Sequence, residues 1–447
     1  MNSSKNILLF GAGKSATVLI DYLKNKVVEK NWTLTVVDNN LELVQLKLKS
    51  HPHTSAIQIN IENEIERKQL IAQADIVISM MPPVLHYLIA VDCIQFSKNL
   101  LTASYIDPKI KLLADEIKRK NLLFIYEMGL DPGIDHMSAM KLIHQIKKLS
   151  GKISSFKSHC GGLVAPINDD NPWHYKISWN PKNVVLAGKA GAIYLKEGKL
   201  IKEPYETIFE SEESMFIEGL EPLSFYPNRD SISYVNTYDL KEIQTFIRTT
   251  LRYPSFKKGW SQIVAWGLTD ETYRYQTEGL SIASFFDIHF QRIGVQNEIS
   301  ELKSTVSTLL NQFLFIGLED KDTFLSMKEA TAAEVLQFIL ETKLVLKKGE
   351  TDMVVMLHEL EYTIKDQFYK TQSSLVAIGQ NDQFTAMAKT VGLPLGIVTV
   401  LILDGKIKEN GLQIPIIESI YEPVLAELAR EGIVFKETTR QVSRKYE

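Results

Sequence analysis

Short apolar runs and longer segments of helical periodicity alternate along the first 128 residues of the chain. The apolar runs cover residues 6–10, 33–37, 56–60, 75–80, 100–104 and 122–126. Most of them are apolar throughout, which is typical of strands that are covered on both faces. Between them, helices are expected at residues 14–26, 41–49, 65–73, 85–96 and 108–120. Repeats of this kind predict a doubly wound α/β domain with a parallel sheet and right-handed crossovers.

The pattern changes after residue 128, where a turn signal at residues 131–133 precedes a helical stretch at residues 136–148. Strands are then predicted at residues 153–159, 184–187, 192–195, 200–202, 353–361 and 373–378. An apolar helix is expected at residues 386–405.

We therefore expect two domains of different architecture. Residues 1–128 form a Rossmann dinucleotide-binding domain, to which residues 380–447 return as C-terminal helices. Residues 129–379 form an α+β domain for substrate binding and dimerisation, with a mainly helical insertion at about 240–345.

Composition and charge narrow the class of protein. Hydrophobic residues make up 45% of the 447 positions and charged residues 23%, which excludes disordered and fibrous chains. The net charge of −4 offers no basic field for nucleic acid. Two cysteines cannot form a disulfide framework. The apolar run at 7–10 is too short for a signal-peptide core, and the run at 393–403 is about half a membrane span. We expect a soluble, cytoplasmic protein with no nucleic-acid or membrane partner.

The strongest chemical motif follows the first predicted strand and opens the first predicted helix. It fits the pattern G-x-G-x-x-G/A and reads Gly11-Ala12-Gly13-Lys14-Ser15-Ala16. The first glycine permits a tight turn, the second lets the backbone approach a pyrophosphate, and the alanine allows close helix–strand packing. Amide N–H groups and the positive helix end then hold the anion. A glycine turn alone also simply connects strands, but in this βαβ context the motif predicts dinucleotide binding.

Asp38 ends the second predicted strand, where a carboxylate accepts hydrogen bonds from the ribose hydroxyls of NAD and repels the 2′-phosphate of NADP. Residues 25–31 lengthen the first crossover, so Asp38 lies further from Gly13 than the usual spacing of about 20 residues. The alternative role is the N-cap of the next helix, for which Asn39 and Asn40 compete. Asp38 favours NAD over NADP without settling the choice.

Candidate site residues also lie where the chain leaves the fourth, fifth and sixth predicted strands. These are Ser79-Met80, Ser104-Tyr105 and residues 129–136. The carboxyl edge of an open α/β sheet lines the cofactor crevice, and the alternative is an ordinary surface turn with a capping residue. Residues 129–136 read Gly-Leu-Asp-Pro-Gly-Ile-Asp-His and combine a rigid turn with two carboxylates and an imidazole. A helix cap would use the same residues. No H-E-x-x-H or C-x-x-C spacing accompanies His136, so we expect no metal site.

Further along the chain, Cys160-Gly161-Gly162 follows a predicted strand, and paired glycines permit close approach of a ligand to the backbone. Without a Cys-His-Asn signature, Cys160 is expected to be a buried small hydrophobe rather than a nucleophile. Arg229 and Arg252 stand beside turn or aromatic residues. Arginine forks bind carboxylates through two parallel hydrogen bonds, and surface ion pairing is the alternative.

Taken together, these segments resemble saccharopine dehydrogenases of the glutamate-forming type, also called saccharopine reductases, over nearly the whole chain. The segments that carry the resemblance are residues 11–16, 102–106, 129–136, 160–179, 226–230, 250–253 and 387–407. Gly-Leu-Asp-Pro-Gly-Ile-Asp-His and Cys-Gly-Gly-Leu are far more specific than the glycine loop. The resemblance implies a Rossmann domain completed by the C-terminal part of the chain, and an NAD(P)-linked oxidation of a secondary amine.

In the reaction that the resemblance implies, hydride leaves the ε-carbon of the lysine part of saccharopine for the nicotinamide. The resulting imine hydrolyses to glutamate and 2-aminoadipate 6-semialdehyde, and the reverse reaction condenses these two and reduces the imine. Arginines suit the three carboxylates of saccharopine, and a carboxylate suits its amines. These small molecules are the expected partners, together with a second copy of the chain in a homodimer.

The binding roles of the family fall on matching positions of this chain. Substrate contacts are implied for Ser104, Tyr105, Asp131, Cys160, Gly161, Arg229 and Arg252. Cofactor contacts are implied for Gly11–Ala16 and for Ser79, Met80, Leu130, Asp131 and Pro132. No residue stands out as a general base, so Asp131 and Tyr105 are the catalytic candidates; the tyrosine pKa of about 10 would need lowering. Many relatives use NADP and have an arginine near the position of Asp38, which leaves NAD or NADP open.

Two other functions stay open. A carboxynorspermidine-synthase-like enzyme would condense a diamine with an aldehyde, and a pocket with additional acidic residues would favour it. A non-catalytic, dinucleotide-sensing Rossmann protein is the other, and Asp131, Arg229 and Arg252 argue against it if they share one pocket.

Overall fold

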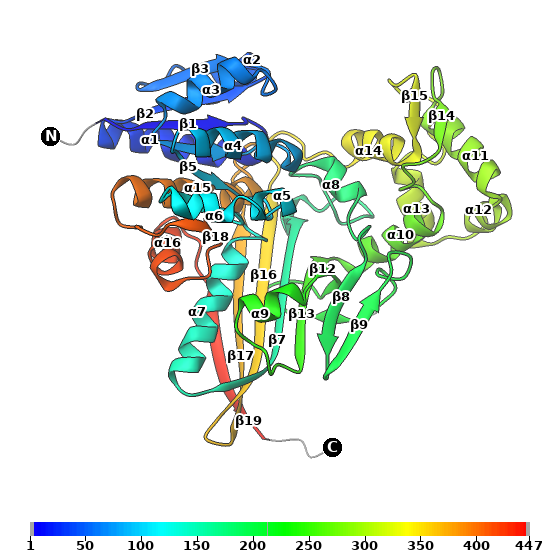
Figure 1. Cartoon of the computed structure of the whole chain (residues 1–447). Coiled ribbons are helices and arrows are strands. Elements are labelled where there is room, and N and C mark those ends of the chain that lie inside the picture. Colours follow the sequence, from blue (N-terminus) through cyan, green and yellow to red (C-terminus); the bar gives the residue numbers. More distant parts are fainter. Residues whose placement is uncertain (1–3, 212, 444–447) are drawn as a thin grey trace. The chain divides into compact units, whose positions relative to one another are not determined.

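The computed structural model describes residues 4–211 and 213–443, and the chain divides into two compact units (Figure 1). The first unit combines the chain up to Ser150 with Gln383–Phe435, and the second combines Gly151–Asp382 with the chain from Lys436 onward. The first unit ends later than the boundary at residue 128 that the sequence pattern suggested, because helix α7 (Ile134–Lys148) packs against α16 (Glu418–Arg430) within it.

The first unit is built on one sheet of seven strands. In sheet order these are β18 (Gly411–Gln413), β6 (Leu123–Ile125), β5 (Asn99–Thr102), β4 (Ile76–Ser79), β1 (Asn6–Phe10), β2 (Thr33–Asp38) and β3 (Thr54–Gln58). Every neighbouring pair is parallel. The six strands expected from the apolar runs are all present, and β18 adds a strand from the C-terminal part of the chain. The predicted α/β class with a Rossmann-type sheet is confirmed.

Helices surround this sheet. They are η1 (Lys14–Ala16), α1 (Thr17–Lys30), α2 (Leu41–Leu48), α3 (Glu64–Gln73), η2 (Pro83–Leu85), α4 (His86–Gln95), α5 (Pro108–Lys111), α6 (Ala114–Arg119), α7, α15 (Ala386–Leu403) and α16. Asn40, Asn63 and Asp107 start three of them by accepting a backbone N–H, which explains why these helices begin where they do.

Helix α15 is a long and strongly apolar helix of the first unit. Its 18 residues are long and apolar enough to cross a membrane, but 78% of that stretch is buried inside the protein. The helix packs against α1, and a Cβ on Gly392 would lie 2.9 Å from the backbone nitrogen of Leu19. The sequence pattern predicted an apolar helix at residues 386–405, and the apolar run at 393–403, which alone is too short for a membrane span, is part of it and contains Pro394 and Gly396. Burial against α1 therefore accounts for the apolar composition of α15.

The second unit is built on a sheet of ten strands. Along its main path lie β10 (Ser214–Met215), β11 (Leu223–Pro227), β13 (Thr245–Arg252), β7 (Lys152–Val164), β16 (Asp352–Ile364), β17 (Gln367–Ile378) and β19 (Lys436–Val442). To the side lie β12 (Arg229–Asp230), β8 (Ala192–Lys196) and β9 (Lys199–Glu203), and the last two, which match the strands predicted at 192–195 and 200–202, form a hairpin. Strands β7 and β13 run parallel, whereas β16 runs antiparallel to β7.

The other elements of the second unit are mainly helices. They are η3 (Pro166–Asn168), α8 (Pro181–Val185), α9 (Ser233–Thr237), α10 (Pro254–Ala265), α11 (Ile282–Ile293), α12 (Gln296–Lys303), α13 (Thr308–Phe315) and α14 (Ala332–Lys343), with a small sheet of β14 (Arg274–Gln276) and β15 (Glu329–Thr331). An aromatic cluster that includes Trp173, Phe256 and Trp260 forms their core.

Three local predictions differ from the structure. Residues 184–187 were expected to be a strand, but Asn180 caps a helix there and Pro181 occupies its first turn. The helical region expected at 240–345 contains β13, a central strand of the second sheet. The segment 380–447, expected to return as helices, includes β18 and also β19, which pairs with β17 in the second unit.

Candidate functional site

The glycine loop lies between β1 and η1 in the first unit. Gly11 has a φ of +98°, and a Cβ there would lie 2.9 Å from the carbonyl oxygen of Met80, so only glycine fits. Gly13 has an extended backbone, and a Cβ there would meet nothing within 4 Å. The N–H of Ala16 donates to the Gly13 carbonyl at 3.0 Å and closes the turn. The loop therefore leaves the backbone at Gly13 open to a ligand, as binding of a pyrophosphate requires.

Asp38 is held against this loop at the end of β2. Its Oδ2 accepts from the N–H of Ala12 at 2.7 Å, and its Oδ1 accepts from the N–H of Asn40 at 3.0 Å. Asn40 is the N-cap of α2, because its side chain accepts from the N–H of Leu43. A carboxylate has about four acceptor positions, so each oxygen retains one for a ribose hydroxyl.

Lys47, which no motif indicated, reaches the same loop from α2. Its Nζ donates to the Gly13 carbonyl at 2.6 Å and to Thr17 Oγ1 at 2.9 Å. Burial lowers the pKa of Lys47 to about 8, and the Asp38 carboxylate opposes this shift. The glycine loop thus contacts a carboxylate through the N–H of Ala12 and an amine through the carbonyl of Gly13.

A buried imidazole joins the carboxyl ends of β4 and β5. Nδ1 of His86 lies 2.8 Å from Ser79 Oγ, and Nε2 lies 2.7 Å from Ser104 Oγ. The side chain is 2% exposed, and burial lowers its pKa to about 4, so the imidazole is neutral near pH 7. Both serines were predicted as site residues from the sequence, but the histidine between them was not.

The loop that follows β6 is closed by its own backbone. The N–H of Ile134 donates to the Gly129 carbonyl at 2.9 Å, and the N–H of Gly133 donates to Asp135 Oδ1 at 2.6 Å. His136 Nε2 lies 2.8 Å from Glu127 Oε2, and both side chains are buried. Asp131 is half-buried, whereas its neighbours in the loop are buried. The motif therefore uses Asp135 and His136 within the protein and leaves Asp131 as its most accessible carboxylate.

In the second unit, Cys160, Gly161 and Arg252 lie together on neighbouring parallel strands. Cys160 of β7 pairs with Thr250 of β13, and residues two apart on a strand share a face, so Arg252 lies on the same face as Cys160. A Cβ on Gly161 would lie 2.5 Å from the carbonyl oxygen of Leu251, so the close approach of the two strands requires glycine here.

Arg252 is buried, with 3% of its surface exposed. One of its NH groups donates to the Leu251 carbonyl at 2.7 Å, and the guanidinium lies 5.0 Å from the ring of Tyr175. Among the residues that the structure describes, no carboxylate pairs with this guanidinium, and its Nε has no hydrogen-bond partner. A buried charge without a counter-ion is unfavourable, so this position is suited to an anionic ligand.

Arg229 is placed differently from Arg252. It lies in the exposed strand β12 with a φ of +51°. Burial raises the pKa of Tyr226, and the positive charges of Arg252 and, more weakly, Arg229 oppose this rise. Tyr226 pairs with Thr250 and therefore lies on the same sheet face as Arg252. Both guanidinium groups thus act on one phenol.

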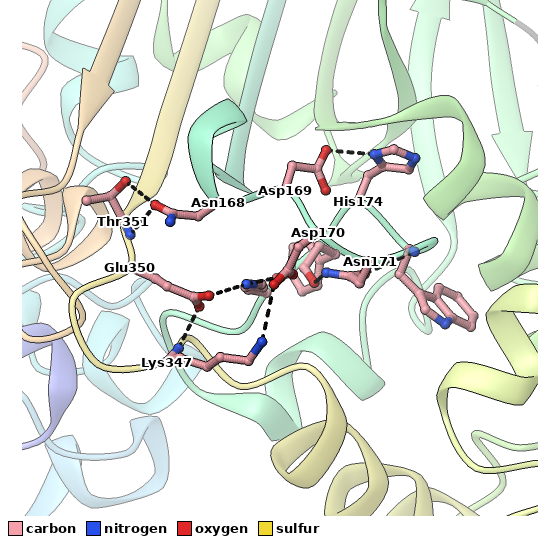
Figure 2. A network of polar contacts seen from close by, with 11 residues as sticks. Asn168, Asp169, Asp170, Asn171, His174, Lys347, Glu350 and Thr351 are labelled. Atoms are coloured by element: carbon pink, nitrogen blue, oxygen red, sulfur yellow. Dashed lines mark hydrogen bonds and ion pairs between the residues drawn. The ribbon is translucent and has the colours of Figure 1, made fainter.

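Residues 168–176, which follow β7, are bound to residues 347–351 by the hydrogen bonds and ion pairs of the polar network in Figure 2. Lys176 is 4% exposed, and its Nζ lies 2.8 Å from Asp170 Oδ1 and 2.7 Å from Glu350 Oε1. The side chain of Asn168 accepts from both the N–H and the hydroxyl of Thr351, at 2.9 and 2.8 Å. The network fixes the segment that carries Tyr175, on which Arg252 packs.

Comparison with known proteins assigns the chain to a family. Residues 7–125 match the model of the saccharopine dehydrogenase NADP binding domain, and residues 129–433 match that of the saccharopine dehydrogenase C-terminal domain. The chain is 31% identical over 446 residues to saccharopine dehydrogenase [NADP(+), L-glutamate-forming] of Schizosaccharomyces pombe, with 97% of this chain and 98% of the relative covered. The chain belongs to the saccharopine dehydrogenase family.

Solved structures and longer relatives agree with this assignment. The apo saccharopine dehydrogenase (L-Glu forming) of Saccharomyces cerevisiae superposes with a TM-score of 0.88 at 31% identity, covering 98% of this chain and 100% of that one. The mitochondrial alpha-aminoadipic semialdehyde synthase of Rattus norvegicus is 33% identical, but the chain spans only 48% of its length. The homospermidine synthase of Legionella pneumophila, at 10% identity and a TM-score of 0.56, shares the fold alone.

Membership of the saccharopine dehydrogenase family confirms the family resemblance that the motifs indicated. It also confirms the expected enzyme class, an oxidoreductase, and supports a nicotinamide dinucleotide as cofactor. Among the described residues, no group of three or more His, Cys, Asp and Glu side chains is arranged to hold a metal ion. The roles of the individual site residues stay predictions.

Proposed function

We propose that this saccharopine dehydrogenase family member oxidises the secondary amine of saccharopine to glutamate and 2-aminoadipate 6-semialdehyde, or catalyses the reverse reductive condensation, in lysine metabolism. Buried Arg252 supports this proposal most directly. Its guanidinium pairs with no carboxylate among the described residues, and saccharopine carries three carboxylates. Arginine binds a carboxylate through two parallel hydrogen bonds, so a substrate carboxylate would supply the missing counter-ion.

The residues of the glycine loop fit a dinucleotide, because the backbone at Gly13 is open and Gly11 allows the close turn. When bound, the nicotinamide accepts a hydride from the ε-carbon of the lysine part of the substrate. We assign the pyrophosphate to Gly11–Ala16 and the ribose hydroxyls to Asp38. We assign the contacts beside the nicotinamide to Ser79, Met80, Leu130, Asp131 and Pro132, as the family resemblance implies. Asp38 supports NAD over NADP, although the relatives are named for NADP.

The residues proposed to hold the substrate divide by chemistry. Arg252 and Arg229 bind carboxylates, and the half-buried Asp131 pairs with an amine and is the first candidate for moving its proton. Ser104 and Tyr105 donate hydroxyl hydrogen bonds, and Tyr105 is the second proton-transfer candidate. Cys160 of β7 lies on the sheet face that carries Arg252 of the neighbouring β13, and Gly161 lies where these two strands approach closely, which supports a role in substrate contact rather than in thiol chemistry.

A mixture assay tests this function against its alternatives. Purified protein is combined with NAD or NADP and with saccharopine, and nicotinamide absorbance and glutamate are followed. A parallel mixture for the reductive direction contains reduced cofactor with a diamine and an aldehyde. Reduction of cofactor with saccharopine alone supports the proposal. Turnover of only the diamine mixture would favour the carboxynorspermidine-type enzyme, and dinucleotide binding without any turnover would favour a sensing protein.

Two further expectations accompany this proposal. We expect a homodimer, which light scattering of the purified protein would detect as a mass twice that of the chain. We also expect a cytoplasmic location, which fractionation of the source cells would test.

A further inference from the structure

The arrangement around His86 links two strand ends that have different proposed roles. Ser79 ends β4, on the side assigned to the cofactor, and Ser104 follows β5, on the side assigned to the substrate. Strands β4 and β5 are neighbours, with Ser79 opposite Thr102. His86 is the first residue of α4, and its imidazole ring contacts both strand ends. Nδ1 lies 2.8 Å from Ser79 Oγ, and Nε2 lies 2.7 Å from Ser104 Oγ.

The surroundings of the ring fix which nitrogen carries the proton. A neutral imidazole has one N–H donor and one acceptor nitrogen. Ser79 is fully buried, and among the described residues its hydroxyl has His86 Nδ1 as its hydrogen-bond partner. A buried hydroxyl proton without an acceptor is unfavourable, so Ser79 donates to Nδ1. The proton of the imidazole then lies on Nε2, which donates to Ser104 Oγ. The hydroxyl of Thr102, at 3.4 Å from Nε2, is the weaker competitor for this nitrogen.

This tautomer decides how Ser104 faces a ligand. Because Ser104 Oγ accepts from the imidazole, its own hydroxyl proton is directed away from the ring. Ser104 is half-buried, and its N–H is occupied by Thr102 Oγ1 at 3.3 Å. The hydroxyl is then a donor that matches a carboxylate oxygen better than a protonated amine.

We propose that His86 is a positioning residue that holds the Ser104 hydroxyl as a hydrogen-bond donor toward a substrate carboxylate, with Ser79 selecting the required tautomer. This inference rests on the substrate role proposed for Ser104. The ring is well placed for such a task, because it is 2% exposed and the ring of Tyr126 lies edge-on to it at 6.3 Å.

A double-mutant cycle separates positioning from a merely structural role. His86→Phe removes both nitrogens and should raise the KM for saccharopine about 3- to 10-fold, the range expected for one neutral hydrogen bond. The dissociation constant of the dinucleotide should change much less. In a Ser104→Ala background the same substitution should change KM by less than about twofold, because the hydroxyl it orients is absent. His86→Gln keeps a donor at about the same reach and should recover part of the loss.

His289→Phe is the matched control. His289 is fully buried and also has two hydrogen-bond partners, Tyr275 and the Trp266 carbonyl, but it lies in the helical core of the second unit. His289→Phe should lower thermal stability, but its effect on KM should be the same with and without Ser104→Ala. Additive effects of His86→Phe and Ser104→Ala on KM would overturn the proposal, since two independent residues behave additively.

A spectroscopic readout decides the tautomer without any turnover. The chain has nine histidines, and the ¹⁵N NMR resonances of His86 are identified as those that are missing from the spectrum of His86→Gln. They should show a protonated Nε2 and an unprotonated Nδ1 near pH 7. An Nδ1–H tautomer would overturn the proposal even in an active enzyme. Because this measurement uses the wild-type protein, it still tests the proposal if His86→Phe fails to fold. An Nε2–H tautomer in a protein that does not oxidise saccharopine would instead overturn the proposed function.

Discussion

At Gly13 the proposed ligand-binding group is the backbone itself. The residue is extended and a Cβ would meet nothing within 4 Å, so valine fits the fold but fills the space above the loop. We predict that Gly13→Val weakens dinucleotide binding at least roughly 100-fold, or about 2.7 kcal/mol, with little change in Tm. Calorimetric titration with NAD and NADP checks this, with Gly13→Ala as the smaller control. Unchanged affinity in the valine variant would show that the pyrophosphate binds elsewhere.

Asp38 carries the choice between the two cofactors. A 2′-phosphate would lie against its carboxylate, so the wild type should have a higher kcat/KM with NAD than with NADP. Asp38→Ser and Asp38→Asn should each move the ratio toward NADP, by about 10-fold or more for removal of a like charge. Asparagine can still accept from the Ala12 N–H, so it separates the charge from the support of the loop. A wild type that prefers NADP contradicts this prediction.

The two arginines should differ in effect because they differ in burial. Arg252→Lys replaces a buried fork by a point charge and should raise the KM for saccharopine roughly 10- to 100-fold. Arg229→Lys should cost less, because Arg229 is exposed. Arg274→Lys is the control, since Arg274 is exposed and paired with Glu329 and Glu334. Steady-state kinetics with cofactor affinity measured in parallel test whether the two arginines bind substrate carboxylates. A loss confined to cofactor binding would contradict this role.

The residues that sequence reasoning found and missed differ in one respect. Gly11 and Gly13 belong to a motif of fixed spacing, and Asp38 ends the second apolar run, so the placement of all three followed from the sequence. His86 and Lys47 are single residues in ordinary helical segments, and their contacts with Ser104 and Gly13 depend on crossovers whose packing no local pattern encodes. The burial of Arg252 could likewise not be predicted, because Tyr175, one of the two rings beside its guanidinium, comes from a distant segment of the chain.

Among the elements, the buried parallel strands were the most predictable, because strands covered on both faces read as unbroken apolar runs. The errors fell on elements whose signals were weak or conflicting. Val184-Val185 favours a strand, yet the cap at Asn180 and Pro181 starts a helix first. Strand β19 is a polar edge strand, and it lacks the apolar signature that made β16 readable.

The segment between β7 and α8 depends on one buried amine for its position. Burial would lower the pKa of Lys176, but hydrogen bonds to Asp170 and Glu350 raise it. Lys176→Met leaves both carboxylates without this partner, and it should lower the free energy of unfolding by about 1–3 kcal/mol. It should also raise the KM for saccharopine, because Tyr175 next to it supports Arg252. Lys347→Met, whose side chain is 65% exposed and contacts the same Asp170, is the control and should change neither quantity appreciably.

At the scale of the whole molecule, the first unit is discontinuous in sequence. Its α15 is buried against α1, next to the glycine loop, and β18 completes its sheet beside β6. The sequence pattern predicted this return as helices and the family resemblance implied it as well, but neither indicated the strand β18. The final strand, β19, belongs to the second unit instead.

Two truncations separate the contribution of α15, β18 and α16 to the first unit from the contribution of β19 to the second. A chain that ends at residue 382 loses α15, β18, α16 and β19, and loss of the first three exposes the apolar surfaces of α1 and β6 that they cover. We predict that it no longer binds dinucleotide and loses the cooperative unfolding of the first unit, because each fully buried aliphatic side chain contributes about 1.5–3 kcal/mol. A chain that ends at residue 435 loses only β19 from the described elements, and should bind dinucleotide with wild-type affinity while unfolding at a lower temperature. Calorimetric binding and differential scanning calorimetry measure both effects. Retained dinucleotide binding in the shorter chain would show that residues up to 150 fold without their C-terminal partners.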